Sequence, residues 1–255
     1  MLRSRASILV VLAVPLSACT PRIDFGSDVL WSARHETGDL SEWSLAGEGG
    51  SAEDPPAATV GVTTAFAHSG RYAVKLTNSA TGDSDTSRVW RESSFPEEAY
   101  YSAWFYLTQA YETTSDWTIL QFRAPSSQDP SVIAQFLDID LGGLPGGNMI
   151  LSVFDHRAPY LRSPTPDVAT PVPIGRWFQI EVFFRNVADS SGRFTVWLDG
   201  KLNYDLERPM GLSSTVYWSP CSSTQDLVPL QSQLYVDDAA VSLVRLTPSG
   251  TLGDP

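Results

Sequence analysis

Hydrophobic and polar positions alternate with period two in segments that recur along this chain. Such segments occur at 70–77, 87–93, 100–107, 117–123, 132–141, 148–156, 177–185, 192–200 and 233–246. Period-two alternation is typical of β-strands with one buried face, and helical periodicity is nearly absent from the sequence. The stretches between these segments are rich in Gly, Pro, Ser and Asp, which favour turns. We therefore predict an all-β protein in which two antiparallel sheets pack as a sandwich.

The strand-like segments predict one domain, because no long linker divides them and sandwiches often reach 200–250 residues. We assign 31–247 to this domain, 19–30 to a short tether and 248–255 to a flexible tail. Two stretches are predicted as longer loops, 157–176 with five prolines and 207–232. Such loops often supply ligand contacts.

Residues 1–18 have the pattern of a bacterial lipoprotein signal peptide. Arg3 and Arg5 precede the apolar run 8–14, which is too short to span a bilayer. Leu-Ser-Ala-Cys, ending at Cys19, resembles the lipobox. The resemblance implies that Cys19 is lipidated and holds the protein in the cell envelope, outside the cytoplasmic membrane. An ordinary secretory signal with an incidental cysteine is the alternative.

The net charge and the cysteines of the chain limit the kinds of binding partner that we expect. The 255-residue chain has a formal net charge of −12 and only two lysines, Lys75 and Lys201. Nucleic acid is not expected as a partner, because binding it requires a basic surface stripe. We expect a monomer that contacts the membrane only through its lipid anchor. With Cys19 lipidated, Cys221 lacks an intramolecular partner, and we interpret it as a passive loop cysteine. A free thiol or an intermolecular bridge is the alternative.

Polar residues at alternate strand positions mark candidate binding faces. Alternation over 117–123 gives two faces: Ile119, Gln121 and Arg123 on one, Thr118, Leu120 and Phe122 on the other. We expect the first face to form the floor of a glycan groove and Leu120 and Phe122 to lie in the core. Similar mixed faces and the second long loop supply substrate-binding candidates: Arg88, Arg91, Glu92, Trp177, Gln179, Glu181, Arg185 and Trp218. Sugars stack on aromatic rings and hydrogen-bond to planar polar groups. Cross-strand ion pairs and aromatic pairs on a solvated face are the alternative.

Five segments occur in a characteristic order: RHETGDLSEW (34–43), HSGRYAVKL (68–76), GRWFQIEVFFR (175–185), GRFTVWLDGK (192–201) and LYVDDAAVSLVRL (234–246). Together they resemble the concanavalin A-like jelly-roll polysaccharide lyases of the heparin lyase I type. The resemblance implies a jelly roll with a polysaccharide in the groove of its concave sheet. It also implies β-elimination of a uronic-acid polymer, which requires a neutralised carboxylate, a base for the C5 proton and an acid for the leaving oxygen.

The family's strand motif has a glutamine and, two residues later, a histidine. Gln121 matches the glutamine, but Arg123 stands in the histidine's place. An arginine stays protonated and cannot act as a general base, although it can neutralise a carboxylate. We assign carboxylate binding to Arg88, Arg91, Gln121 and Arg123. Proton transfer is assigned to His156 and Tyr160, while a structural role for a histidine at a strand end is the alternative.

The resemblance also implies a structural calcium ion. Glu36 in an E-x-G turn and Asp238 in the VDD strand, with Asp237 in reserve, offer the hard oxygen ligands that calcium requires. A locally capped turn and an exposed Asp-Asp turn are the alternative.

The sequence leaves three functions open: a lipid-anchored polysaccharide lyase, a non-catalytic glycan-binding lipoprotein, and a structural or adhesive envelope protein. The acidic net charge opposes binding of a polyuronate. Screening limits that repulsion to about 8 Å at physiological ionic strength, so a local arginine cluster can outweigh it. The arginines proposed for such a cluster are Arg88, Arg91, Arg123, Arg157, Arg162 and Arg185.

Overall fold

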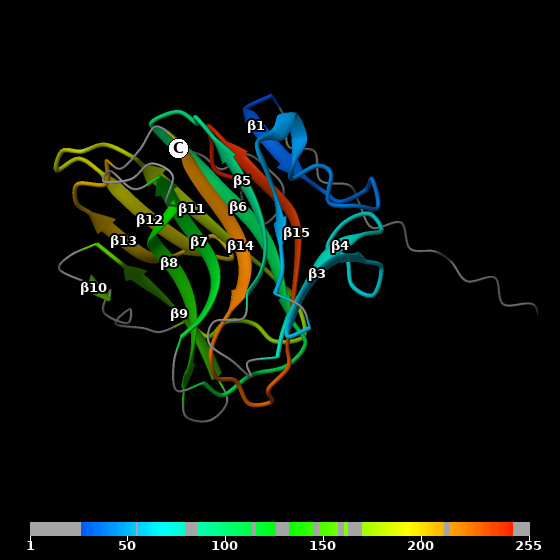
Figure 1. The fold of residues 1–255 in the computed structure, drawn as a ribbon. Coiled ribbons are helices and arrows are strands. Elements are labelled where there is room, and N and C mark those ends of the chain that lie inside the picture. The colour runs from blue at the N-terminus through cyan, green and yellow to red at the C-terminus, as the bar shows by residue number, and fades with distance from the viewer. Residues whose placement is uncertain are drawn as a thin grey trace, which may run out of the picture.

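Two antiparallel sheets pack face to face in the computed structural model of the chain (Figure 1). The structure describes residues 27–54, 56–79, 86–113, 116–125, 133–144, 148–157, 161–162, 170–211 and 215–246. Within these residues nearly every ordered element is a strand, apart from one short 3-10 helix at Leu45–Gly47. The predicted all-β sandwich is confirmed.

The front sheet, which faces the viewer in Figure 1, contains the strands that carry the candidate site. In spatial order they are β10 (Leu161–Arg162), β9 (Asn148–Asp155), β8 (Ile133–Leu144), β7 (Trp117–Pro125), β14 (Val216–Ser223), β5 (Thr86–Ser93) and β2 (Gly49–Ala52). Strand β14, from near the end of the chain, lies between β5 and β7. Residues distant in sequence therefore become neighbours across this sheet.

The back sheet lies behind it. Its spatial order is β13 (Lys201–Glu207), β12 (Arg193–Leu198), β11 (Trp177–Arg185), β6 (Glu98–Leu107), β15 (Ser232–Ser242), β4 (Ala73–Asn78) and β3 (Ala58–Thr63). Strand β1 (Val29–Ala33) also pairs with β15. Strand β15 thus takes an interior position, as β14 does in the front sheet.

The core between the sheets is built largely of aromatic rings. Phe122 of the front sheet is fully buried, and its ring lies 5.1 Å from Tyr101, 5.5 Å from Phe184 and 5.2 Å from Phe194 of the back sheet. Leu120 is buried in the same cluster. The prediction that Leu120 and Phe122 face the core is therefore confirmed.

A register shift between Thr118 and Leu120 changes the face of one predicted residue. Thr118 donates a hydrogen bond to Asp140 at 2.8 Å, whereas Ile119 joins the hydrophobic core. A bulge inserts one extra residue and breaks the simple alternation of a strand. The expected grouping of Ile119 with Gln121 is consequently wrong.

The predicted loop 207–232 is also wrong, because it contains strand β14. The strand contains Pro220 and three serines, which are typical of turns, so the sequence does not reveal a buried strand here. Cys221 belongs to this strand and not to a loop. It is fully buried, its thiol lies 3.6 Å from the carbonyl oxygen of Thr118, and burial raises the pKa of the thiol.

Candidate functional site

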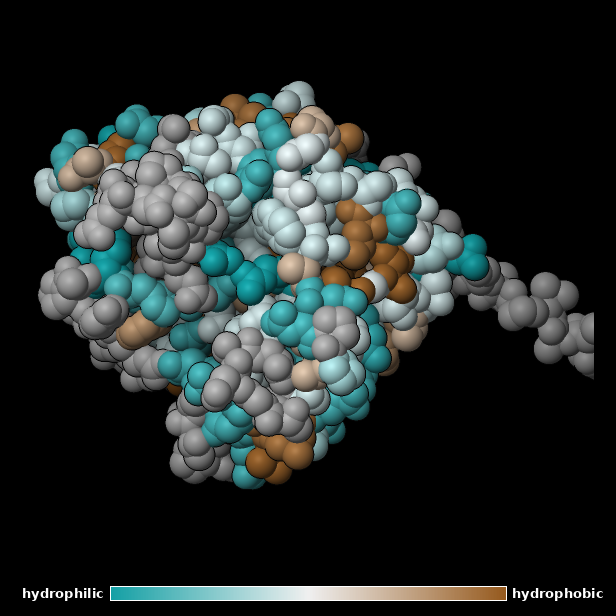
Figure 2. Space-filling view, viewed as in Figure 1, coloured by the Kyte–Doolittle hydropathy of each residue, from teal (hydrophilic) through white to brown (hydrophobic). Residues whose placement is uncertain are grey.

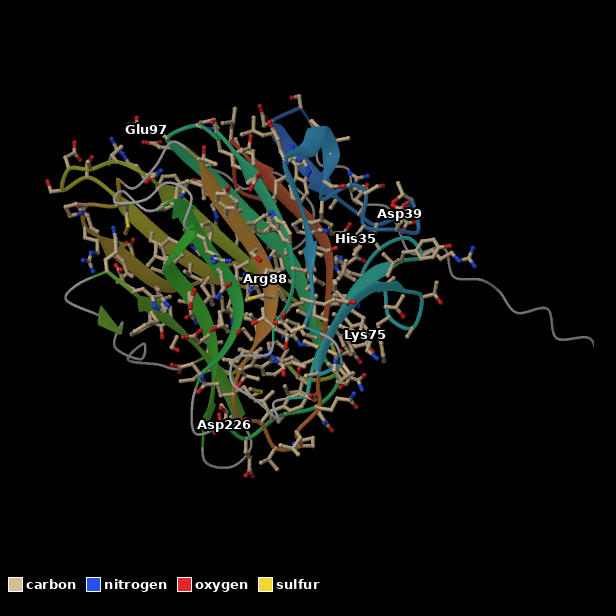
Figure 3. The ribbon with its side chains drawn as sticks, viewed as in Figure 1. His35, Asp39, Lys75, Arg88, Glu97 and Asp226 are labelled. Carbon is tan, nitrogen blue, oxygen red and sulfur yellow. The ribbon has the colours of Figure 1, made fainter. Side chains whose placement is uncertain are left out.

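The outer face of the front sheet carries polar side chains from adjacent strands. Tyr217 of β14 is in register with Arg123 of β7 on one side and with Glu92 of β5 on the other. Directly opposite residues of neighbouring strands share a face, so these side chains lie together. Figure 2 shows hydrophilic residues in a hollow on this face, and Figure 3 places Arg88 near the middle of the sheet. This face is the candidate groove.

An open pocket of about 260 Å³ lies where β5, β14 and β7 adjoin, lined by Ala52, Arg88, Trp90, Glu92, Arg123, Tyr217 and Ser219. Burial, and then the nearby positive charge of Arg88, lower the pKa of the Arg123 guanidinium. The Nε atom of Arg88 is buried without a hydrogen-bond partner among the described residues. Two guanidinium groups that line the same pocket form a candidate carboxylate-binding site, because carboxylates accept bidentate hydrogen bonds from arginine.

Asp138 of β8 connects three of the predicted catalytic residues. It is in register with Gln121, and its Oδ2 atom lies 2.8 Å from Nε2 of His156. Burial raises the pKa of Asp138, while hydrogen bonds from His156 and Gln121 and the charge of Arg123 oppose that rise. The structure thus brings Gln121, Arg123 and His156 together through a residue that the sequence did not single out.

His156 has the features of a proton acceptor. Its side chain is 28% exposed, and the hydrogen bond to Asp138 raises the pKa of the imidazole, partly opposed by burial. If Nε2 donates to Asp138, then Nδ1 of the neutral ring is an acceptor. The Phe154 ring lies 4.5 Å from the imidazole and limits its movement.

The chain on both sides of His156 is held by a buried ion network. Asp155 accepts hydrogen bonds from Nε and Nη2 of Arg157 at 2.9 and 2.6 Å, and Arg208 lies 3.0 Å away. Arg157 also donates to the carbonyl of Pro209 at 2.9 Å. Arg157 is therefore tied to Asp155 and does not join Arg88 and Arg123 as predicted.

Tyr217 is a groove residue that the sequence analysis missed in favour of its neighbour Trp218. Burial, and then a hydrogen bond with Glu92, raise the pKa of the Tyr217 hydroxyl, so it stays protonated at neutral pH. Trp218 is fully buried, 5.8 Å from the Trp43 ring and 5.9 Å from the Trp31 ring. Its predicted place in the groove is wrong, because adjacent strand residues face opposite sides.

Four predicted binding residues lie on the back sheet. Trp177, Gln179, Glu181 and Arg185 alternate along the outer face of β11. Glu181 accepts a hydrogen bond from Arg245 at 2.9 Å, and Arg185 lies 3.1 Å from Glu98. The prediction that these residues share the groove is wrong, because β11 belongs to the other sheet.

Arg91 is also placed wrongly by the sequence analysis. It lies on β5 between Trp90 and Glu92, which face the groove. Because successive residues of a strand point to opposite faces, Arg91 points away from the groove. It is 6% exposed and donates hydrogen bonds to the carbonyl of Leu45 at 2.5 Å and to Glu48 at 2.7 Å. Of the eight substrate-binding candidates, the structure brings Arg88 and Glu92 to the pocket.

Some predictions fall outside the described residues: the lipidated Cys19, the proton-transfer candidate Tyr160 and the side chain of Arg162. In the part of the chain that is described, no helix is both long and apolar enough to cross a membrane.

The predicted calcium ligands accept hydrogen bonds from the protein. Glu36 accepts one from the backbone N–H of Arg71 at 2.8 Å. Asp238 accepts one from the Ser69 hydroxyl at 2.9 Å and lies 2.7 Å from Nδ1 of His68. No cluster of three or more His, Cys, Asp or Glu side chains that suits a metal occurs among the described residues. Calcium stays a prediction, and these hydrogen bonds do not favour it.

Asp237, the reserve calcium ligand, belongs to a buried hydrogen-bond network instead. Its Oδ1 atom lies 3.3 Å from Nδ1 of His35, which is completely buried. The indole N–H of Trp43 donates to Nε2 of the same histidine at 2.9 Å. Because Nε2 accepts this bond, the proton of the neutral His35 ring lies on Nδ1, toward Asp237.

The fold and the groove together define a two-sheet β-sandwich with an open pocket on the outer face of its front sheet. A family model described as polysaccharide lyase matches residues 35–217. The chain therefore belongs to the polysaccharide lyase family. No curated protein matches the chain.

Solved structures show the same fold. An endo-β-1,4-glucuronan lyase from the fungus Trichoderma reesei has a TM-score of 0.61 at 17% identity, covering 84% of this chain and 95% of that one. An alginate lyase in complex with an alginate trisaccharide has a TM-score of 0.56 at 11% identity, covering 84% and 98%. The cellulose induced protein Cip1 has a TM-score of 0.55 at 15% identity, covering 85% and 98%. At these identities the likeness establishes the jelly-roll fold alone.

Proposed function

We propose that this protein binds a uronic-acid-containing polysaccharide in the front-sheet groove and cleaves it by β-elimination. One observation carries the proposal: Asp138 joins His156 to Gln121 and Arg123 on a groove floor that also holds Arg88. β-Elimination needs a neutralised carboxylate beside a proton acceptor, and this arrangement supplies candidates for both.

The carboxylate of the sugar to be cleaved is bound by Arg88 and Arg123, with the Gln121 amide as a further donor. These groups withdraw charge from the carboxylate, which makes the adjacent C5 proton more acidic and stabilises the carbanion-like transition state. Arg123 thus acts through its permanent charge, consistent with its position in place of the family's histidine.

His156 and Tyr217 divide the proton transfers. Neutral His156 accepts the C5 proton at Nδ1, the electrons of that C–H bond form the C4–C5 double bond, and the C4–O bond breaks. Tyr217 then donates its proton to the leaving oxygen. Strand β14 carries Tyr217 on one side of β7, while His156 reaches over β8 from the other, so acid and base approach the sugar from two sides.

The named structural relatives support the substrate class, because glucuronan and alginate are both polymers of uronic acids. A relationship to the heparin lyase I type in particular belongs to this proposal. So does lipid anchoring at Cys19, with the enzyme held in the bacterial envelope outside the cytoplasmic membrane.

The deciding experiment incubates the purified protein with a panel of uronic-acid polysaccharides and measures ultraviolet-absorbing unsaturated ends. We expect product from at least one polymer, and none from His156→Gln or Tyr217→Phe protein with an unchanged melting temperature. Binding without product would favour a non-catalytic glycan-binding lipoprotein, which the Arg123 substitution at the histidine position also suggests. Neither binding nor product would leave a structural or adhesive role.

Anchoring is tested separately by Cys19→Ser. This variant should remain unprocessed or be released from the membrane, because the cysteine is the proposed acylation site. Unchanged partitioning into detergent would exclude the lipoprotein assignment.

A further inference from the structure

The pocket continues past the proposed cleavage site toward the edge of the front sheet. Trp90 and Glu92 of β5 line this part, with Ala52 of β2 beyond them. Adjacent strands lie about 5 Å apart, so β5 is about 10 Å from β7. One sugar residue of an extended polysaccharide is about as long as the spacing between adjacent strands. A chain with one sugar over β7 therefore has the next sugar over β14 and the second sugar along over β5.

Trp90 has the features of an aromatic platform. Its ring is partly exposed and lies over Gly50, its register partner on β2. A Cβ atom at position 50 would lie 3.1 Å from Cζ2 of the Trp90 ring. The glycine therefore lets the indole lie close to the strand, and the pocket is open above it. Flat aromatic surfaces of this kind stack against the C–H faces of sugar rings.

Glu92 gives the platform a negative rim. It lies on the same face as Trp90, and the Tyr217 hydroxyl hydrogen-bonds to it. A carboxylate accepts hydrogen bonds from sugar hydroxyls but repels the carboxylate of a uronate. Arg88 and Arg123 supply the positive charge of the proposed carboxylate site. Along β5, Arg88 lies two residues before Trp90 and Glu92 lies two residues after it.

We infer that Trp90 and Glu92 form a subsite for an uncharged sugar, and that the preferred polymer combines uronic acid with neutral sugar residues. The inference rests on the proposed function, because it places the cleaved uronate over β7. It goes beyond that function because it names a class of polymer, one that contains neutral sugars as well as uronic acids.

Binding is tested by affinity electrophoresis in gels that contain either a homopolymer of glucuronic acid or a polymer in which two neutral sugars separate successive glucuronic acids. In the second polymer the sugar over β5 is neutral when a glucuronate lies over β7. The wild-type protein should bind this second polymer more tightly. Trp90→Ala should weaken that binding about 10-fold, whereas Trp90→Phe should retain most of it. Trp177→Ala removes a partly exposed tryptophan from the back sheet and is the matched control, with no expected effect.

Glu92→Gln gives the sharper result. It should tighten binding of the homopolymer about five-fold and leave binding of the polymer with two neutral sugars per repeat nearly unchanged, because the amide no longer repels a uronate. Equal wild-type affinity for both polymers, or no change of preference in Glu92→Gln, would overturn the subsite. Unsaturated ends measured in parallel separate the two proposals. Preferential binding without product supports the subsite and contradicts the lyase. Equal binding and equal cleavage of both polymers would support the lyase and contradict the subsite.

Discussion

The outer faces of the two sheets carry the same kinds of residue and use them differently. Arginine, glutamine, glutamate and aromatic rings alternate along β11 of the back sheet, as they do along β5 and β7 of the front sheet. On the back sheet, Arg245 lies over the Trp197 ring at 4.1 Å and donates to the buried Glu181. There the charged and aromatic groups stabilise one another.

On the back sheet Gln179 Oε1 is still a buried acceptor without a donor among the described residues, whereas on the front sheet several such atoms occur on neighbouring strands. Gln121 Oε1 and Asp138 Oδ1 are buried acceptors with no hydrogen-bond donor among the described residues, and Arg88 Nε is a buried donor without an acceptor. Buried polar atoms are seldom left unsatisfied, so such a cluster fits a ligand rich in hydroxyl and carboxylate groups. A polar strand face thus indicates a binding site where several such atoms lie beside an open pocket, and a single unsatisfied atom does not.

The largest expected effect separates two histidines that have the same kind of partner. His156→Gln should lower turnover of the preferred polymer about 10²- to 10⁴-fold, the usual loss when a general base is removed. His68, which lies 2.7 Å from Asp238, is the matched control. His68→Gln should leave turnover per folded molecule unchanged in the same assay. Equal losses in both variants would contradict the assignment of His156 as the base.

The next effect compares the two sides of β7. Phe122→Ala should cost about 3–5 kcal/mol of unfolding free energy, because it removes a ring from the aromatic core and leaves a cavity. Arg123→Ala should change stability by only about 0.5 kcal/mol, as surface substitutions do. It should instead weaken ligand binding by about 1.5–3 kcal/mol through loss of a charge-assisted hydrogen bond.

Thermal melts and one binding assay on both variants provide the test. If Arg123→Ala destabilises the fold as much as Phe122→Ala and leaves binding intact, Arg123 belongs to a structural ion pair.

A substitution on the back sheet should lower stability without affecting cleavage. Glu181 is 1% exposed, and Glu181→Ala would leave Arg245 without its partner. The expected cost is about 3 kcal/mol of stability, because one member of a largely buried pair is removed. Cleavage per folded molecule should not change. A selective loss of cleavage at constant melting temperature would show that the back face also contacts the polysaccharide.

The smallest effect concerns pH. The hydrogen bond to Asp138 raises the pKa of His156 above its ordinary value of 6.5. Because the base must be neutral, kcat/KM should rise with pH through a midpoint above 6.5 in the wild type. Asp138→Asn should move this midpoint down. The stability contributed by protonated His156 has the opposite trend, since it is full below the unfolded-state pKa and is lost as pH rises through the raised one. If Asp138→Asn leaves the midpoint of kcat/KM unchanged, His156 is not the group whose titration controls the reaction.

The sequence predicted the strands whose two faces differ strongly. Strand β11 was placed at 177–185, as the structure has it, because large apolar residues alternate without interruption. Strand β2 consists only of Gly, Ser and Ala, so it shows no apolar face. Strand β3 alternates Val60 and Val62 with small or polar residues, but it is short and was also not predicted. Strand β14 was missed because Pro220 and its serines resemble a turn.

The candidate site was harder to predict, because alternation identifies a face but not the sheet to which it belongs. Gln121, Arg123 and His156 were found from their polarity and the family resemblance. Asp138 lies in the stretch FLDIDL, where an acid at alternate positions also suits an ordinary solvated face. Trp218 was selected instead of its neighbour Tyr217, because the sequence does not show which residues of β14 face outward. The pairing of β14 with β7 places Tyr217 opposite Arg123.

Strands β14 and β15 have a further consequence for how the chain folds. Each lies inside its sheet, β14 between β5 and β7 and β15 between β6 and β4, so both sheets remain divided until residues beyond 216 are present. Contacts between segments so far apart in sequence are formed slowly. The two sheets are therefore completed only after β14 and β15 have been synthesised, and the groove is one of the last features of this domain to form. A chain truncated before β14 would lack Tyr217 and, beyond that, any continuous sheet on which to bind a polysaccharide.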